Sequence, residues 1–173
     1  MAILEFSRRY AMAHRLLAEP SSKCVIPHGH NEIVTVRLAP KAPFRFGGAN
    51  ALAPFENIKG RWHAWIDGAV DHSLHLGEDD PLLGYFRAHE PAQLKRVMTF
   101  PGDPTTEALA ASFWLKLSAF LEADALPFAV ENLRVEETPT NTVVITRETF
   151  DPLECGLALN AWQRRADMSI NDF

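Results

Sequence analysis

Two histidines and a cysteine lie close together in residues 24–30, and their types and spacing suit metal-assisted chemistry. Residues two apart in a strand point to the same face, so His28 and His30 can bind one metal ion. Neutral imidazole suits zinc, and a catalytic zinc site usually has three protein ligands and one open position. His14 is the best-placed third ligand, because it ends an apolar run that can pair as the preceding strand. The alternative is that His28 and His30 are surface residues at the start of a strand.

The order of these residues resembles the signature of the 6-pyruvoyltetrahydropterin synthase and 6-carboxytetrahydropterin synthase family. His14, followed by Cys24 and by His-Gly-His at 28–30, is similar to the zinc and nucleophile motif of that family. Three further matches follow in the family order: Asp-His at 71–72, Pro-Thr-Thr-Glu at 104–107, and a strand ending in Glu-Thr at 137–138. The matches span about residues 6–145, and their combination is far more specific than any one of them.

The resemblance implies separate roles for the metal and the thiol. Zinc bound by the three histidines, His14, His28 and His30, would act as the Lewis acid on the hydroxylated side chain of a pterin. Cys24 would be the base, since positive charge from Lys23 and from zinc favours its thiolate. Without the family context, Cys24 also fits a small buried residue.

The resemblance also implies roles for the later motifs. Asp71 and His72 would form a catalytic pair in which the carboxylate orients an imidazole that relays protons. Glu137 would anchor the pterin ring and assist the relay, because a carboxylate can accept two parallel hydrogen bonds from an amidine-like edge. The residues expected near the ligand at the start of a helix are Thr105, Thr106 and Glu107. Taken singly, His72 fits a helix end and Glu137 a solvated strand residue.

Length and composition place these motifs in one globular domain, residues 1–173, with 47% hydrophobic residues. Lys and Arg number 17 against 22 for Asp and Glu, which gives no reason to expect a nucleic-acid surface. No apolar run approaches the roughly 20 residues that span a bilayer. With two cysteines and no signal-like N-terminus, a cytoplasmic protein without disulfides is expected.

The motifs require strands and helices to position them. Residues 3–14 and 30–38 predict an antiparallel hairpin, and 130–138 and 142–150 predict two further strands. Residues 55–71 and a segment after Asp103, which we expect to be the N-cap, predict two helices. Residues 39–54 form a long connection. Residues 73–102 predict an insertion that is a surface excursion without chemistry, and 151–173 form a C-terminal tail of unassigned function.

The element order ββααββ is an α+β arrangement: a four-stranded antiparallel sheet with two helices on one face. It matches the tunnelling fold that the resemblance implies. In that fold, sheets of several subunits join into a barrel, as a trimer or a dimer of trimers, and active sites form between subunits. A homo-oligomer is therefore expected.

The resemblance implies a zinc-dependent lyase that converts 7,8-dihydroneopterin triphosphate to 6-carboxy-5,6,7,8-tetrahydropterin, with release of acetaldehyde and triphosphate, for queuosine-type deazapurine synthesis. The three-residue gap between Cys24 and His28 favours this type. The alternative is a 6-pyruvoyltetrahydropterin synthase, which eliminates triphosphate but keeps the side-chain carbons. A rival of another class is a non-catalytic zinc-binding module, because Pro54 and Leu76 depart from the family pattern and 73–102 could reshape the pocket. Cys155, His63, His75 and His89 match no motif, and these histidines are predicted to lie at the surface.

Overall fold

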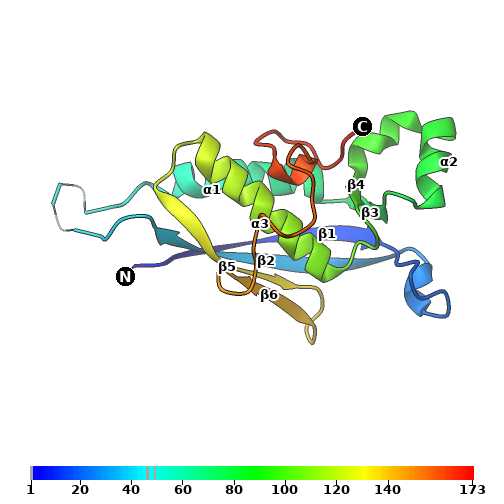
Figure 1. Ribbon diagram of the computed structural model, residues 1–173, viewed down its shortest axis with the longest axis horizontal. Helices are drawn as coiled ribbons and strands as arrows, with labels where there is room; N and C mark the ends of the chain where they lie inside the picture. The colour runs from blue at the N-terminus through cyan, green and yellow to red at the C-terminus, as the bar shows by residue number, and fades with distance from the viewer. Residues whose placement is uncertain (1, 46, 49) are drawn as a thin grey trace.

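A long antiparallel hairpin forms the centre of the computed structural model, which describes residues 2–45, 47–48 and 50–173 (Figure 1). Its strands are β1 (Leu4–His14) and β2 (His28–Pro40), paired from Leu4 with Leu38 to His14 with His28. Alternate residues of both strands are buried, as expected of strands with one covered face. The predicted hairpin is confirmed. In the predicted connection 39–54, Phe46 and Ala49 lie outside the described residues.

Two further antiparallel strands extend the sheet beyond β2. β5 (Phe128–Glu136) pairs with β2, with an irregular register between Arg37 and Leu38, and β6 (Thr142–Thr146) pairs with β5. Both strands were predicted, although the last one is shorter than the expected 142–150. Glu137 directly follows β5 and therefore lies at the turn between these strands.

The prediction of a four-stranded antiparallel sheet is wrong, because the segment 73–102 adds two strands on the other side of β1. β3 (Ser73–Gly77) and β4 (Val97–Phe100) run parallel to β1, which gives six strands in the order β4-β3-β1-β2-β5-β6. Between them lie α2 (Pro81–His89) and a 3₁₀ helix (Pro91–Arg96). All four residues of β4 are buried, so the segment is not simply a surface excursion. β4 is covered on both faces, which removes the alternation that identifies a strand in the sequence.

Two longer helices cover one face of the sheet, as predicted (Figure 1). α1 (Phe55–Trp65) continues into a π-helical turn (Ile66–Val70), and α3 (Thr106–Ala123) packs on β5 and on α1. The expected N-cap Asp103 is wrong: Thr105 caps α3 and accepts from the Ala108 N–H. No helix among the described residues is long and apolar enough to cross a membrane.

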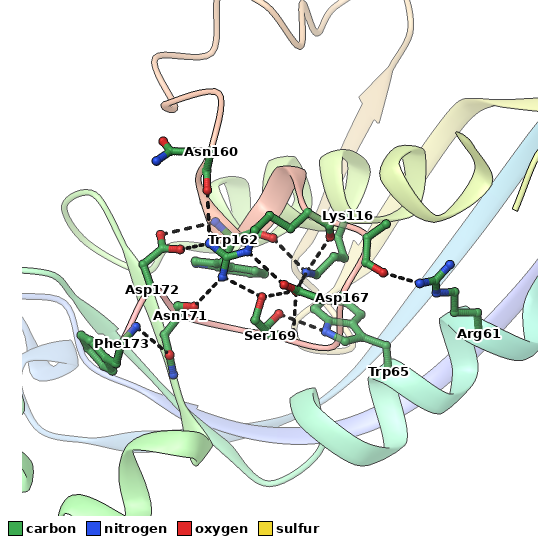
Figure 2. A network of polar contacts seen from close by, with 12 residues as sticks. Arg61, Trp65, Lys116, Asn160, Trp162, Asp167, Ser169, Asn171, Asp172 and Phe173 are labelled. Atoms are coloured by element: carbon green, nitrogen blue, oxygen red, sulfur yellow. Dashed lines mark hydrogen bonds and ion pairs between the residues drawn. The ribbon is translucent and has the colours of Figure 1, made fainter. Parts of the chain in front are cut away.

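The C-terminal residues 151–173 pack against α3 and the sheet edge, although the sequence predicted no role for them. Trp162 and Ile170 are buried in the main core. The Lys116 ammonium on α3 donates to the carbonyls of Trp162 and Arg165 at 2.8 and 2.9 Å (Figure 2). The Thr99 N–H on β4 donates to the Ile170 carbonyl at 3.2 Å. The tail therefore covers the outer edge of the sheet, which would otherwise expose unpaired backbone groups.

Candidate active site

The hairpin brings the three predicted metal ligands together at one end of the sheet. His14 ends β1 and pairs directly with His28 at the start of β2, while His30 lies opposite Met12. All three side chains point to the helix-covered face, because they occupy alternate positions of paired strands. One ring nitrogen from each histidine lies within 4.8 Å of the others. Three imidazoles at this spacing can hold one metal ion.

Backbone carbonyls fix the orientation of two of these rings. His14 Nδ1 lies 3.0 Å from the Pro104 carbonyl, and His28 Nδ1 lies 2.9 Å from the Ile26 carbonyl. A carbonyl oxygen can only accept, so both Nδ1 atoms are assigned the proton. The two Nε2 atoms then direct lone pairs at each other across 3.1 Å. A cation between them relieves this repulsion, and such carbonyl-held imidazoles are typical of metal ligands. The residues present therefore fit a metal ion.

Burial and glycine geometry preserve this arrangement. His14 is 3% exposed, and burial lowers the pKa of His14, which keeps the imidazole neutral as a metal ligand requires. A Cβ at Gly29 would lie 2.7 Å from the Met12 carbonyl oxygen, so a side chain between His28 and His30 would push the two strands apart. The glycine of the His-Gly-His motif is thus explained by the close approach of β1.

Cys24 lies in the loop between the two strands, on a short 3₁₀ helix (Lys23–Val25). The Ser22 hydroxyl accepts from the Cys24 N–H at 3.1 Å, and the Leu16 N–H donates to the Cys24 carbonyl at 2.8 Å. The thiol is free and half-buried. Cys24 is thereby tied to the residues that directly follow His14, although it is not part of the histidine cluster in the described residues.

A pocket of about 510 Å³ opens beside His14 and collects the predicted substrate-binding residues. They are Thr105, Thr106, Glu107 and Glu137. The Thr106 hydroxyl donates to Glu137 Oε1 at 2.7 Å. Burial pushes the pKa of Glu137 up, but the hydrogen bond from Thr106 and the nearby His30 outweigh it and lower the pKa, so Glu137 is an anion. Thr105 has the simpler role of helix cap.

Two residues that interact with Glu137, Asn141 and Glu32, have no counterpart among the predicted site residues. Asn141 lines the pocket and hydrogen-bonds Glu137. Glu32 is 1% exposed, accepts from the Tyr10 hydroxyl at 2.5 Å, and follows His28 and His30 on the same face of β2. Burial raises the pKa of Glu32 to about 7. The alternation of β2 indicates that Glu32 points inward, whereas Asn141 lies in a turn whose conformation no periodicity predicts.

Asp71 and His72 form the expected pair, but away from the pocket beside His14. His72 Nδ1 lies 2.8 Å from Asp71 Oδ2, and Asp71 Oδ1 accepts from the Ala11 N–H at 2.8 Å. His72 has a φ of 63°, a region that residues other than glycine rarely adopt. Its side chain is 79% exposed, and none of the hydrogen bonds of the described residues joins it to the pocket beside His14. The contact between Asp71 and His72 is therefore formed, but the His72 imidazole faces solvent.

Three positions that depart from the family pattern or match no motif lie outside this pocket. His75 is fully buried, so its predicted surface location is wrong; it pairs with His14 across β3 and β1, and Ser73 Oγ lies 2.9 Å from its Nε2. Leu76 is buried with Leu83 and Val97 in a small cluster. Pro54 directly precedes α1. Neither Pro54 nor Leu76 lines the pocket beside His14.

Comparison with known proteins gives consistent matches over most of the chain. The family model described as 6-pyruvoyl tetrahydropterin synthase matches residues 3–148. The 6-carboxy-5,6,7,8-tetrahydropterin synthases of Rickettsia felis and Rickettsia conorii are 29% and 30% identical over 126 and 127 residues, which are 73% of this chain and 86% of each relative.

Solved structures share the fold at lower identity. An uncharacterized protein from Wolinella succinogenes has a TM-score of 0.64 and 19% identity, covering 85% of this chain and 99% of its own. The 6-pyruvoyl tetrahydropterin synthase of Caenorhabditis elegans has a TM-score of 0.54 and 21% identity, covering 84% and 94%. At these identities, the likeness is evidence of a common fold and of nothing finer.

Proposed function

The chain belongs to the 6-pyruvoyl tetrahydropterin synthase family, and from this premise we propose that it is a zinc-dependent lyase of the 6-carboxytetrahydropterin synthase type. Its substrates are 7,8-dihydroneopterin triphosphate and one water, and its products are 6-carboxy-5,6,7,8-tetrahydropterin, acetaldehyde and triphosphate. The names of the matched Rickettsia relatives support this reaction. The observation that carries the proposal is the convergence of three imidazoles beside a pocket containing an anionic glutamate.

Each part of the site has a chemical task in this reaction. The three histidines would hold zinc, which would supply a Lewis acid for negative charge developing on a substrate oxygen. Cys24 Sγ accepts the proton that leaves the substrate side chain. Glu137 binds the pterin ring through parallel hydrogen bonds from its amidine-like edge, and Thr106 holds the carboxylate in place. The substrate is thereby anchored at the ring and reacts at the side chain.

The Glu137 assignment predicts a change in substrate affinity. Replacing Glu137 by glutamine should raise KM by about tenfold to a hundredfold, because hydrogen bonds to a charged group are lost while the shape of the pocket is kept. Steady-state kinetics with 7,8-dihydroneopterin triphosphate measure this change. Glu148→Gln, at an exposed position outside the pocket, is the matched control and should leave KM unchanged. An unaltered KM in the Glu137→Gln variant contradicts the assignment.

The reaction itself is tested by its volatile product. The purified protein, loaded with zinc, is incubated with 7,8-dihydroneopterin triphosphate, and acetaldehyde and the pterin are quantified together. We expect one acetaldehyde for each 6-carboxy-5,6,7,8-tetrahydropterin formed. A product that retains the three-carbon side chain identifies the 6-pyruvoyl reaction instead. Zinc binding without turnover of any pterin triphosphate supports the non-catalytic module.

The exposed Asp71 and His72 pair is accounted for by an assembly with shared sites. β6 is one edge of the sheet, and β1 pairs with β3 only through Met12–His14 in the described residues, so the first part of β1 is also an open edge. Open edges accept strands from another chain. The proposal includes a barrel of joined sheets, as a trimer or a dimer of trimers, in which His72 serves the pocket of a neighbouring subunit.

Shared sites predict activity from two inactive variants. Cys24→Ala and His72→Ala should each be inactive alone, but after mixing and reassembly about a quarter of the sites should contain both intact residues, since random pairing combines one half with one half. Turnover of the mixture, compared with each variant treated alone, measures this recovery. If His72 serves the pocket of its own chain, the mixture stays inactive.

A further inference from the structure

A buried ion pair connects the segment 73–102 to the end of the strand that carries His14. Arg15 directly follows His14, and its Nε donates to Asp80 Oδ2 at 2.8 Å while its Nη2 contacts Asp80 Oδ1. The Asp80 side chain is 2% exposed and that of Arg15 is 16% exposed. A fork of two parallel hydrogen bonds fixes both the distance and the direction of the guanidinium. β1 is therefore held at the point where it leaves the metal site.

Asp80 is itself rigidly placed. It is the N-cap of α2, and its Oδ1 accepts from the Leu82 N–H at 2.8 Å. Its backbone N–H donates to the Gly77 carbonyl at the end of β3. α2 and the loop after β1 lie at the same end of the molecule (Figure 1). The segment 73–102, which extends the sheet beyond β1, thus provides a fixed acceptor for Arg15.

The three residues that follow Arg15 are held as well. Leu17 and Ala18 donate their backbone N–H groups to Asp103 Oδ1 and Oδ2, both at 2.9 Å. Leu16 donates to the Cys24 carbonyl at 2.8 Å. Residues 15–18 are consequently fixed by Asp80 on one side and Asp103 on the other, and the loop with the thiol is fixed to them through Leu16.

From this arrangement we propose that Asp80 is a positioning residue, which acts through Arg15 to hold the Cys24 loop beside the histidine cluster. The inference rests on the proposed function for the role of Cys24, but the coupling between Asp80 and the thiol does not depend on which substrate is used. The segment 73–102 thereby gains a part in the site, although none of its residues lines the pocket beside His14.

The test replaces Asp80 by asparagine in the full chain loaded with zinc. Asparagine caps a helix as well as aspartate does, so α2 is kept while the charged fork to Arg15 is lost. We expect iodoacetamide to alkylate Cys24 about tenfold faster relative to Cys155 in the same molecule, because the loop opens more often once a charged hydrogen bond is removed. We also expect kcat to fall by about tenfold or more with little change in KM, since Glu137 and Thr106 lie on other elements.

Two comparisons make the result decisive. Asp79→Asn removes the charge of the exposed neighbouring residue and should change neither the alkylation ratio nor kcat. Arg15→Lys keeps the charge but loses the fork, and should have little further effect in the Asp80→Asn background. An unchanged Cys24 alkylation ratio in both Asp80→Asn and Arg15→Lys overturns the inference. Absence of turnover in the unmodified protein refutes the proposed function alone, because the alkylation ratio is measured without substrate.

Discussion

Replacing Cys24 by alanine is expected to lower turnover by about a hundredfold to ten-thousandfold, which is the usual contribution of a general base. The metal content should stay at the level of the unmodified protein, because the three ligand nitrogens come from histidines and are held by the hairpin and by backbone carbonyls. Turnover with the pterin triphosphate and elemental analysis of the same preparation measure both effects.

The matched control is His30→Ala, which removes a ligand and leaves the thiol. It should lose metal and turnover together, since two remaining imidazoles form an incomplete zinc site. A fully active Cys24→Ala variant, or one that loses its metal, contradicts the assignment of Cys24 as the base. Retention of full metal content by His30→Ala means that the ligands are misassigned.

The histidine cluster could be predicted from the sequence because it depends on local periodicity. His28 and His30 are two apart in one strand, and His14 ends the preceding strand, which pairs antiparallel with it across the loop 15–27. The direction of the His72 side chain could not be predicted in this way. Adjacency in sequence predicts its contact with Asp71, but it says nothing about the direction of an exposed imidazole at φ 63°.

The sheet extension could not be predicted in the same way. β3 and β4 have only five and four residues; β3 pairs in parallel with β1, about sixty residues earlier in the chain, and β4 pairs in parallel with β3. Parallel pairing is set by the crossover and by packing on both faces, so no alternation of polar and apolar residues marks it. The position of Asp80 follows from this topology, and its contact with Arg15 is therefore visible only in the structure.

The packing of the C-terminal segment could not be predicted either, because its partner is a lysine within an apolar helix. α3 is buried on most of its surface, and Lys116 lies among the rings of Trp65, Phe120 and Trp162. The ammonium donates to two carbonyls of the tail and contacts Asp167 at 3.3 Å (Figure 2). A charge in such surroundings remains only because its donors are all used.

Replacing Lys116 by methionine is expected to reduce the free energy of unfolding by about 3–5 kcal/mol at pH 7, because one buried and one partly buried carbonyl lose their donor while the volume is roughly kept. Asp167 is half exposed and can turn to water, so it adds little to this loss. Urea denaturation followed by tryptophan fluorescence measures the change. Lys95→Met, at an exposed position, is the matched control and should stay within about 0.5 kcal/mol of the unmodified protein.

The pH dependence of the stability difference between the unmodified protein and Lys116→Met tests whether the hydrogen bonds to the two carbonyls cause it. Burial lowers the pKa of Lys116 to about 8 in the folded protein, against about 10.4 in an unfolded chain. Between these values the unfolded chain binds one more proton than the folded one, so the titration of Lys116 adds stability as pH rises from about 8 to about 10.4. This added part is lost as pH falls through 8, where only the contribution of the hydrogen bonds remains. Neutral lysine still has two N–H donors for the two carbonyls. The gap between the unmodified protein and Lys116→Met should therefore widen from pH 8 to pH 10. A gap that narrows over this range means that the ammonium is bound more tightly than the neutral amine, and that the ion pair with Asp167 dominates instead.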